Sequence, residues 1–259
     1  MTQTQRRTYL IAALLKEQPQ YADIELPADG QEQKRLLRSL LNIRRPAPVT
    51  AEFLKIQDDY LQEEISRKGM TRLEDLIPEQ GNLYLWQGDI TTLRCDAIVN
   101  AANRQMLGCF CPCHGCIDNA IHTYAGVQLR LTCAEWMAQQ EHAEETGRAK
   151  ITPAYNLPSQ YVLHTVGPIV GETLTARDEE LLASCYRSCL ALAGRNGLKS
   201  IAFPCISTGE FHFPNGRAAA IAIQTVTEFL RKQHSEIRVI FNVFKDADYD
   251  LYQKLLRAN

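Results

Sequence analysis

The sequence lacks the features that mark several large classes of protein. Its apolar stretches are all shorter than the roughly 20 residues that cross a membrane. Lys and Arg number 28 and Asp and Glu number 30, a net charge of −2, so binding to nucleic acid or to a membrane is not expected. Neither G-x-x-x-x-G-K-[ST] nor G-x-G-x-x-G occurs, which excludes a P-loop and a Rossmann dinucleotide fingerprint.

Cysteine is abundant, but its distribution argues against disulfides. The chain has nine cysteines, an odd number, and several of them are clustered after residue 108. Clustering of this kind is not a disulfide framework, so the thiols are expected to be reduced and the protein cytoplasmic. The basic and then apolar N-terminus runs into Lys16 and Glu17 without a small-residue cleavage site, which favours an amphipathic helix over a signal peptide.

The chain of 259 residues has room for one large α/β domain with an appendage. Residues 1–70 read as helical and are predicted to form an extension that packs on the main domain. In residues 71–259 strands and helices alternate, which predicts helices on both faces of a mostly parallel sheet. The expected helices are 8–17, 31–43, 51–68, 119–140 (broken near Gly126), 178–196, 216–233 and 248–257, and the expected strands are 83–86, 97–102, 160–166, 200–206 and 237–244.

The densest chemistry lies in the run C-F-C-P-C-H-G-C-I-D-N-A-I-H at residues 109–122. A soluble protein rarely gathers so many soft ligands in one loop without binding a metal. Thiolate and imidazole together favour zinc, which takes three or four such ligands. The loop also follows an apolar strand that ends in N-A-A-N, so the sequence indicates an active site at a strand end.

Other polar residues follow the predicted strands. Asp118, at a helix start, could orient or deprotonate a water, or could be only a helix N-cap. Asn103 could bind sugar hydroxyls or cap a turn, and Asp89 of G-D-I-T could accept from an adenine amino group or merely form a turn. The glycine-centred loop S-T-G-E-F-H-F-P-N at 207–215 could cradle a diphosphate with its N–H groups. His122 is expected to be a packed, hydrogen-bonded histidine.

These motifs, in this order, resemble a macrodomain: G-D-I-T, A-I-V-N-A-A-N, I-D-N-A-I-H and S-T-G-x-F-x-F-P. The run L-G-C-F-x-P-x-H-x-C-I-D-N-A-I-H is similar, more narrowly, to the zinc-dependent macrodomains found beside bacterial sirtuins that ADP-ribosylate lipoyl-carrier proteins. The helical extension also fits that subfamily. The resemblance implies a macrodomain-type α/β/α three-layer sandwich with a mixed, mostly parallel central sheet.

The resemblance further implies a zinc site. Cys109, His114 and Cys116 match the ligands of the subfamily, and C-x4-H-x-C leaves one Zn²⁺ position open, as in catalytic sites. Cys111 or Cys113 as a fourth ligand would instead make the zinc structural, so the fourth ligand is left open between water and these two thiols.

A catalytic pair and an ADP-ribose-binding set follow from the same resemblance. Asp118 matches the acidic residue of related hydrolases, and Asn103 matches the residue that orients the distal ribose. The residues implied to bind ADP-ribose are Asp89, Ile90, Asn103, Asn119, Ser207, Thr208, Gly209, Glu210, Phe211 and Phe244, of which Phe244 would stack on adenine.

The implied function is hydrolysis that removes mono-ADP-ribose from modified protein side chains, as Asp or Glu esters. The expected partners are ADP-ribose and a mono-ADP-ribosylated protein, for which the resemblance suggests a lipoyl carrier. Two alternatives remain open: a reader module that binds ADP-ribose without turnover, and a hydrolase of small esters such as O-acetyl-ADP-ribose. The enzyme is favoured because a reader needs neither Asp118, nor Asn103, nor the zinc ligands.

Overall fold

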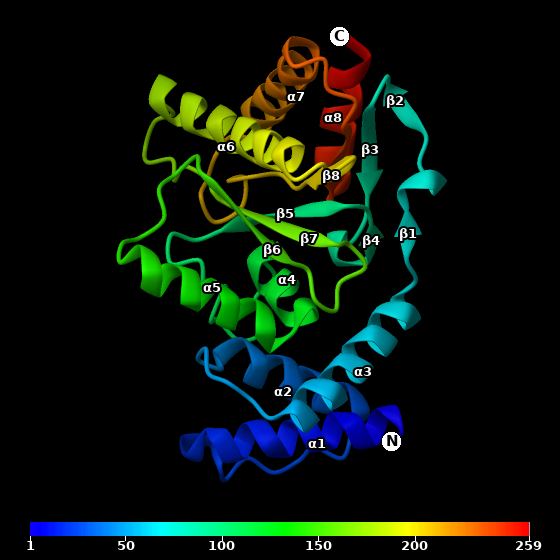
Figure 1. Cartoon of the computed structure of the whole chain (residues 1–259), viewed down its shortest axis with the longest axis vertical. Coiled ribbons are helices and arrows are strands. Elements are labelled where there is room, and N and C mark those ends of the chain that lie inside the picture. Colours follow the sequence, from blue (N-terminus) through cyan, green and yellow to red (C-terminus); the bar gives the residue numbers. More distant parts are fainter. Residues whose placement is uncertain (259) are drawn as a thin grey trace.

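A seven-stranded mixed sheet forms the centre of the protein in the computed structural model, which describes residues 1–258 (Figure 1). The two outer strands, β2 and β6, run antiparallel to their neighbours, and all other neighbours are parallel. In spatial order the strands are β2 (Pro78–Gln80), β3 (Leu83–Gln87), β9 (Arg238–Val243), β8 (Ser200–Phe203), β5 (Ala97–Ala102), β7 (Tyr161–Val166) and β6 (Ala149–Pro153). A separate pair, β1 (Thr71–Arg72) and β4 (Leu93–Arg94), is also parallel.

Helices cover both faces of the sheet, so the predicted three-layer α/β/α arrangement with a mixed, mostly parallel sheet is confirmed (Figure 1). One face packs against α6 (Ala176–Arg195), α7 (Asn215–Lys232) and α8 (Asp246–Ala258). The other packs against α4 (Ile117–Ala125) and α5 (Val127–Gln140). The predicted break near Gly126 is also confirmed, because this glycine separates α4 from α5 with a φ of 96°.

Three N-terminal helices lie beyond α4 and α5, at the bottom of Figure 1. They are α1 (Gln3–Glu17), α2 (Gly30–Ile43) and α3 (Ala51–Lys68), and they share an apolar core of their own. The first begins earlier than predicted, because Thr2 and Gln5 form a capping box. The bounds of α3 agree with the prediction, and Gly69 ends it with a φ of 86°. The division of the chain at residue 70 stays a prediction.

Short connecting elements complete the chain. The 3₁₀ helices are η1 (Pro19–Tyr21), η2 (Leu73–Asp75) and η3 (Ile90–Thr92). The sequence did not predict the short strands β1, β2 and β4 or the edge strand β6. It predicted β8 too long: the strand ends at Phe203 because Pro204 follows, and proline has no N–H for a sheet ladder.

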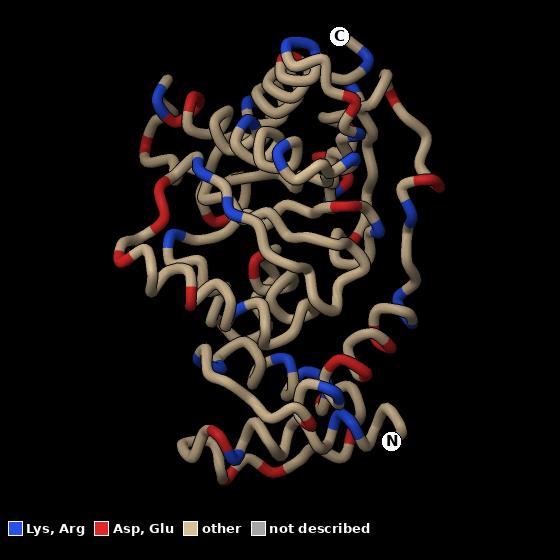
Figure 2. Tube along the Cα trace, in the orientation of Figure 1, with Lys and Arg blue, Asp and Glu red and all other residues tan. Residues whose placement is uncertain are grey.

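Charged residues are distributed along the whole fold, and the described helices are not of the membrane-spanning kind. Basic and acidic positions are interspersed along the chain in Figure 2, in keeping with the net charge of −2. Within residues 1–258, none of the helices combines the length and the apolar character that a membrane span requires.

Candidate active site

The predicted site residues gather at one edge of the sheet. Five neighbouring strands, β3, β9, β8, β5 and β7, are parallel, so their carboxyl ends lie on the same side. This edge is where ligands of such sheets bind. The segments that follow four of these strands carry Asp89 and Ile90 after β3, Phe244 after β9, the 207–211 loop after β8 and Asn103 after β5.

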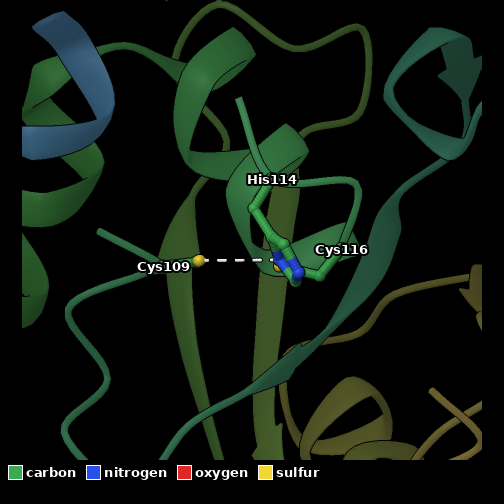
Figure 3. A group of neighbouring side chains, drawn as sticks. All are labelled: Cys109, His114 and Cys116. Atoms are coloured by element: carbon green, nitrogen blue, oxygen red, sulfur yellow. Dashed lines mark hydrogen bonds between the residues drawn. The ribbon is translucent and has the colours of Figure 1, made fainter. Parts of the chain in front are cut away.

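Cys109, His114 and Cys116 point toward one another in front of α4 (Figure 3). Their ligand atoms all lie within 4.8 Å of one another, and Cys109 Sγ is 3.8 Å from His114 Nδ1. A tetrahedral zinc would place a sulfur and a nitrogen ligand about 3.6 Å apart, given the usual Zn–S and Zn–N distances. The donor set and its spacing therefore fit zinc, with one position left for another ligand.

The two additional cysteines lie outside this group. Cys111 is exposed, and the sulfur of Cys113 is 3.2 Å from Ser39 Oγ and donates to the Arg35 carbonyl at 3.5 Å. Neither thiol shares the 4.8 Å cluster of the three predicted ligands.

Asp118 lies in the first turn of α4 and is buried, with 5% of its surface exposed. Its Oδ1 accepts from Asn100 Nδ2 at 2.8 Å, and its Oδ2 accepts from Asn103 Nδ2 at 3.1 Å. Burial raises the pKa of Asp118 to about 6, although both amides and the Arg130 guanidinium favour the ionised form. The N-cap of α4 is Cys116, whose sulfur accepts from the Asn119 N–H, so the N-cap interpretation of Asp118 is wrong.

A buried chain of hydrogen bonds supports Asp118 from behind. Asn100 Nδ2 also lies 3.2 Å from His164 Nδ1, which can only accept from it. His164 Nε2 then carries the proton and donates to Thr152 Oγ1 at 3.0 Å. The chain therefore fixes one neutral tautomer of His164 and holds Asn100 against the carboxylate.

His122 lies beside Asp118 without joining this chain. It is buried as predicted, but neither ring nitrogen has a hydrogen-bond partner among the described residues, so the prediction of a hydrogen-bonded histidine is wrong. Its Nε2 is 3.5 Å from Asp118 Oδ1. Burial holds the pKa of His122 well below its usual value, so this contact joins a neutral imidazole to the carboxyl group.

The neutral state of His164 predicts a loss of stability in acid. Burial lowers the pKa of His164 to about 3, whereas the pKa of a histidine in the unfolded chain is about 6.5. Between these values the unfolded chain binds a proton that the folded chain does not, so the free energy of unfolding falls as the pH falls. From pH ~7.5 to ~5.5, wild type should lose about 1 kcal/mol more than His164→Gln. Denaturant unfolding at each pH measures both losses, and equal losses would contradict a neutral His164.

The 207–211 loop is a compact turn between β8 and α7. Ser207 has a φ of 65°, and its carbonyl accepts from the Phe213 N–H at 3.0 Å. The backbone of Gly167, after β7, approaches so closely that a Cβ there would lie 2.0 Å from Ser207 Oγ. Glu210 Oε1 lies 3.6 Å from His114 Nε2, so the 207–211 loop reaches residues 109–116, the predicted metal-binding loop. A carboxylate on the second nitrogen of a ligating histidine would orient the ring.

Asp89 and Phe244 lie at the other end of the site. Asp89 Oδ1 accepts from the Thr91 N–H at 3.0 Å, and its Oδ2 accepts from Lys68 Nζ at 2.9 Å. Burial opposes ionisation, but these bonds outweigh it and hold the pKa of Asp89 below its usual value. The side chain of Ile90 is in the core, and Phe244 is 76% exposed.

The three-dimensional contacts add residues that the sequence did not single out. Asn100 and His164 support Asp118, while Lys68 contacts Asp89. Arg38 donates to the predicted substrate-binding Asn119, with Nη2 2.8 Å from Oδ1. Of these residues, only Asn100 belongs to one of the motifs, A-I-V-N-A-A-N. His164, Lys68 and Arg38 lie far from the motifs in the sequence, where no spacing pattern marks them.

The fold and site define a three-layer α/β protein whose candidate site lies at the carboxyl edge of a mixed sheet, and comparisons with known proteins name the family. The Macro domain family model matches residues 99–222. A protein-ADP-ribose hydrolase of Treponema medium is 57% identical over 99% of this chain and 100% of its own length. A protein-ADP-ribose hydrolase of Staphylococcus aureus (strain MRSA252) is 47% identical over 96% and 94%, respectively.

Comparison with solved structures gives the same family. A Trypanosoma brucei macrodomain in complex with ADP-ribose has a TM-score of 0.66 and 33% identity, covering 84% of this chain and 94% of that one. The chain belongs to the macrodomain family. With two relatives at 47% and 57% identity that are named hydrolases, the prediction of a hydrolase is confirmed.

Proposed function

We propose that this protein is a zinc-dependent hydrolase that removes mono-ADP-ribose from acidic side chains of a modified protein. The observation that carries the proposal is the position of Asp118. Its two oxygens are held by Asn100 and Asn103, and two residues before it stands Cys116, one of three converging soft ligands. The names of the relatives support protein-ADP-ribose as the substrate class.

The distal ribose would lie between Asn103 and the metal-binding loop. Asn103 Nδ2 donates to Asp118 Oδ2 at 3.1 Å, so an amide that can meet a sugar hydroxyl is already fixed against the carboxylate. The 207–211 loop would hold the diphosphate with its backbone N–H groups. Asp89 and Phe244 would meet the adenine at the far end.

In the proposed reaction a water attacks the anomeric carbon of the distal ribose. The new bond joins the water oxygen to that carbon, and the bond from the carbon to the side-chain oxygen breaks with its electron pair. Asp118 would accept the proton of the water, and a carboxyl with a pKa of about 6 is mostly ionised at neutral pH. The products are ADP-ribose and the unmodified carboxylate.

Cys109, His114 and Cys116 would hold the zinc ion. When bound there, zinc would supply Lewis acidity to an oxygen of the water or of the ribose. Glu210 would orient His114 through Nε2, since the carboxylate is 3.6 Å away.

The biological setting is part of the proposal. All nine cysteines are free, which fits a reducing cytoplasm. We propose a lipoyl-carrier protein modified by an associated sirtuin as the partner, on the strength of the zinc-loop sequence alone. Residues 71–259 would form the catalytic domain and residues 1–70 its helical extension.

Linkage specificity tests the proposal. We would present three substrates at equal concentration: a carrier protein mono-ADP-ribosylated on Glu, the same protein modified on Arg, and O-acetyl-ADP-ribose. Intact mass and free ADP-ribose would be followed over time. The account predicts release from the Glu-linked protein and none from the Arg-linked protein, because a carboxylate leaves readily without an acid. Faster turnover of O-acetyl-ADP-ribose than of either protein would favour a small-ester hydrolase instead.

A further inference from the structure

One face of α2 contacts the metal-binding loop directly. Arg38 Nη2 donates to the carbonyl of His114 at 3.0 Å and to Asn119 Oδ1 at 2.8 Å. One turn later, Asn42 Oδ1 accepts from the Cys113 N–H at 2.9 Å. Residues 38 and 42 are four apart, so they project from the same side of the helix. The N-terminal helices therefore meet the loop through specific polar contacts to its backbone.

The loop itself has little regular structure to define its shape. No helix or strand spans the residues between Ala102, where β5 ends, and Ile117, where α4 begins. Cys113 has a φ of 53°, a conformation that a residue with a side chain rarely adopts. Fixing each such residue costs conformational entropy, so contacts from outside the loop are needed to hold it.

Asn119 links Arg38 of α2 to two residues of the metal-binding loop, Cys111 and Cys116. Its backbone N–H donates to the sulfur of Cys116 at 3.4 Å, and its Nδ2 donates to the carbonyl of Cys111 at 3.0 Å. Arg38 holds the remaining oxygen of the same amide. The orientation of this amide, and with it the path of the loop, therefore depends on a residue of the extension.

The helix that carries Arg38 is itself fixed to the main domain. Arg130, of which 6% is exposed, lies at the C-terminus of α2 and donates from Nη1 to the carbonyls of Leu41, Asn42 and Arg44 at 3.0, 2.9 and 2.6 Å. A guanidinium at this end satisfies carbonyls that lack helical partners and complements the helix dipole. Because α2 is anchored in this way, Arg38 is held at a defined distance from the loop.

We propose that Arg38 is a positioning residue of the metal centre: it holds residues 111–116 in the conformation in which Cys109, His114 and Cys116 converge. The extension is then a working part of the site, although Arg38 lies outside the matched residues 99–222. The inference rests on the proposed function, because it takes zinc as the resident metal.

The test compares Arg38→Ala, Arg38→Lys and the control Arg35→Ala in the full chain. Arg35 lies on the same helix and is exposed, and its side chain makes no hydrogen bond or ion pair within residues 1–258. Zinc affinity is measured by competition with a chromogenic chelator, and ligand geometry by the visible absorption spectrum of the Co²⁺-substituted proteins. We expect about 10- to 100-fold weaker zinc binding and an altered cobalt spectrum in Arg38→Ala. Arg38→Lys should recover part of the affinity, since it keeps the charge but not the fork of donors.

Wild-type affinity and an unchanged cobalt spectrum in Arg38→Ala would overturn the inference, as would an equal loss in Arg35→Ala. Circular dichroism of the metal-free proteins checks the fold, and if Arg38→Ala is unfolded, Arg38→Lys decides by the same two measurements. The outcome is separable from that of the proposed function. A wild type that binds zinc but hydrolyses nothing sinks the function and leaves this inference standing, whereas a wild type that binds no zinc sinks both.

Discussion

Asp118→Asn should lower the turnover number by a factor of about 10²–10⁴ and change the affinity for ADP-ribose only slightly. The substitution keeps the size of the side chain but removes the group that accepts a proton from the attacking water. Asn100 and Asn103 both donate to this carboxylate, so an amide here presents a donor where an acceptor is needed. Turnover is measured by intact mass of the modified protein, and ADP-ribose affinity by calorimetry.

The pair of measurements separates an enzyme from a reader. A reader would have no turnover to lose in Asp118→Asn, and its affinity would be unchanged. Circular dichroism and thermal unfolding would establish that Asp118→Asn remains folded. A folded variant that retains wild-type turnover would remove Asp118 from the reaction and contradict the proposed mechanism.

Cys116→Ser should lose zinc and with it at least about 10²-fold in turnover. A serine hydroxyl is a poor zinc ligand compared with a thiolate, and the two remaining ligands cannot hold the ion at ordinary concentrations. The matched control is Cys111→Ser, because Cys111 lies five residues before Cys116 but is exposed and outside the three-ligand cluster. Zinc content is measured by atomic emission after gel filtration, alongside turnover.

The control also tests Cys111 as the fourth ligand. Unchanged zinc content and turnover in Cys111→Ser would exclude that thiol and leave the position to water, substrate or Cys113. Loss of zinc in Cys111→Ser would instead show a closed, structural site. Full turnover by a zinc-free Cys116→Ser protein would contradict zinc dependence outright.

The sequence predicted the elements whose pattern is local. Residues 51–68 were predicted as a helix ending at Gly69, and α3 has these bounds; in the structure Thr50 caps its start. The edge strand β6 was missed: A-K-I-T-P is short and proline-terminated, and it forms a strand by pairing with β7. Its structure is decided by a partner that a single-sequence pattern does not contain.

The same distinction between local and long-range patterns applies to the site residues. The motif order brought Asn103, Asp118 and the three soft ligands into one hypothesis, and the structure places all five side chains together at the sheet edge. Arg38 and His164 could not be found in that way. Arg38 lies 81 residues before its partner Asn119, and His164 lies 64 residues after its partner Asn100. Both reach the site through contacts that exist only in the folded chain.

Incubation of the purified protein with a carrier protein mono-ADP-ribosylated on an acidic residue, with and without a zinc chelator, tests the central claim most directly. Products are weighed by intact mass, and circular dichroism confirms that the chelated protein is folded. The account predicts that the mass of ADP-ribose disappears from the carrier with the untreated protein, persists after chelation and disappears again when zinc is restored. Persistence of the modification with the zinc-loaded protein, while ADP-ribose still binds tightly, would contradict it.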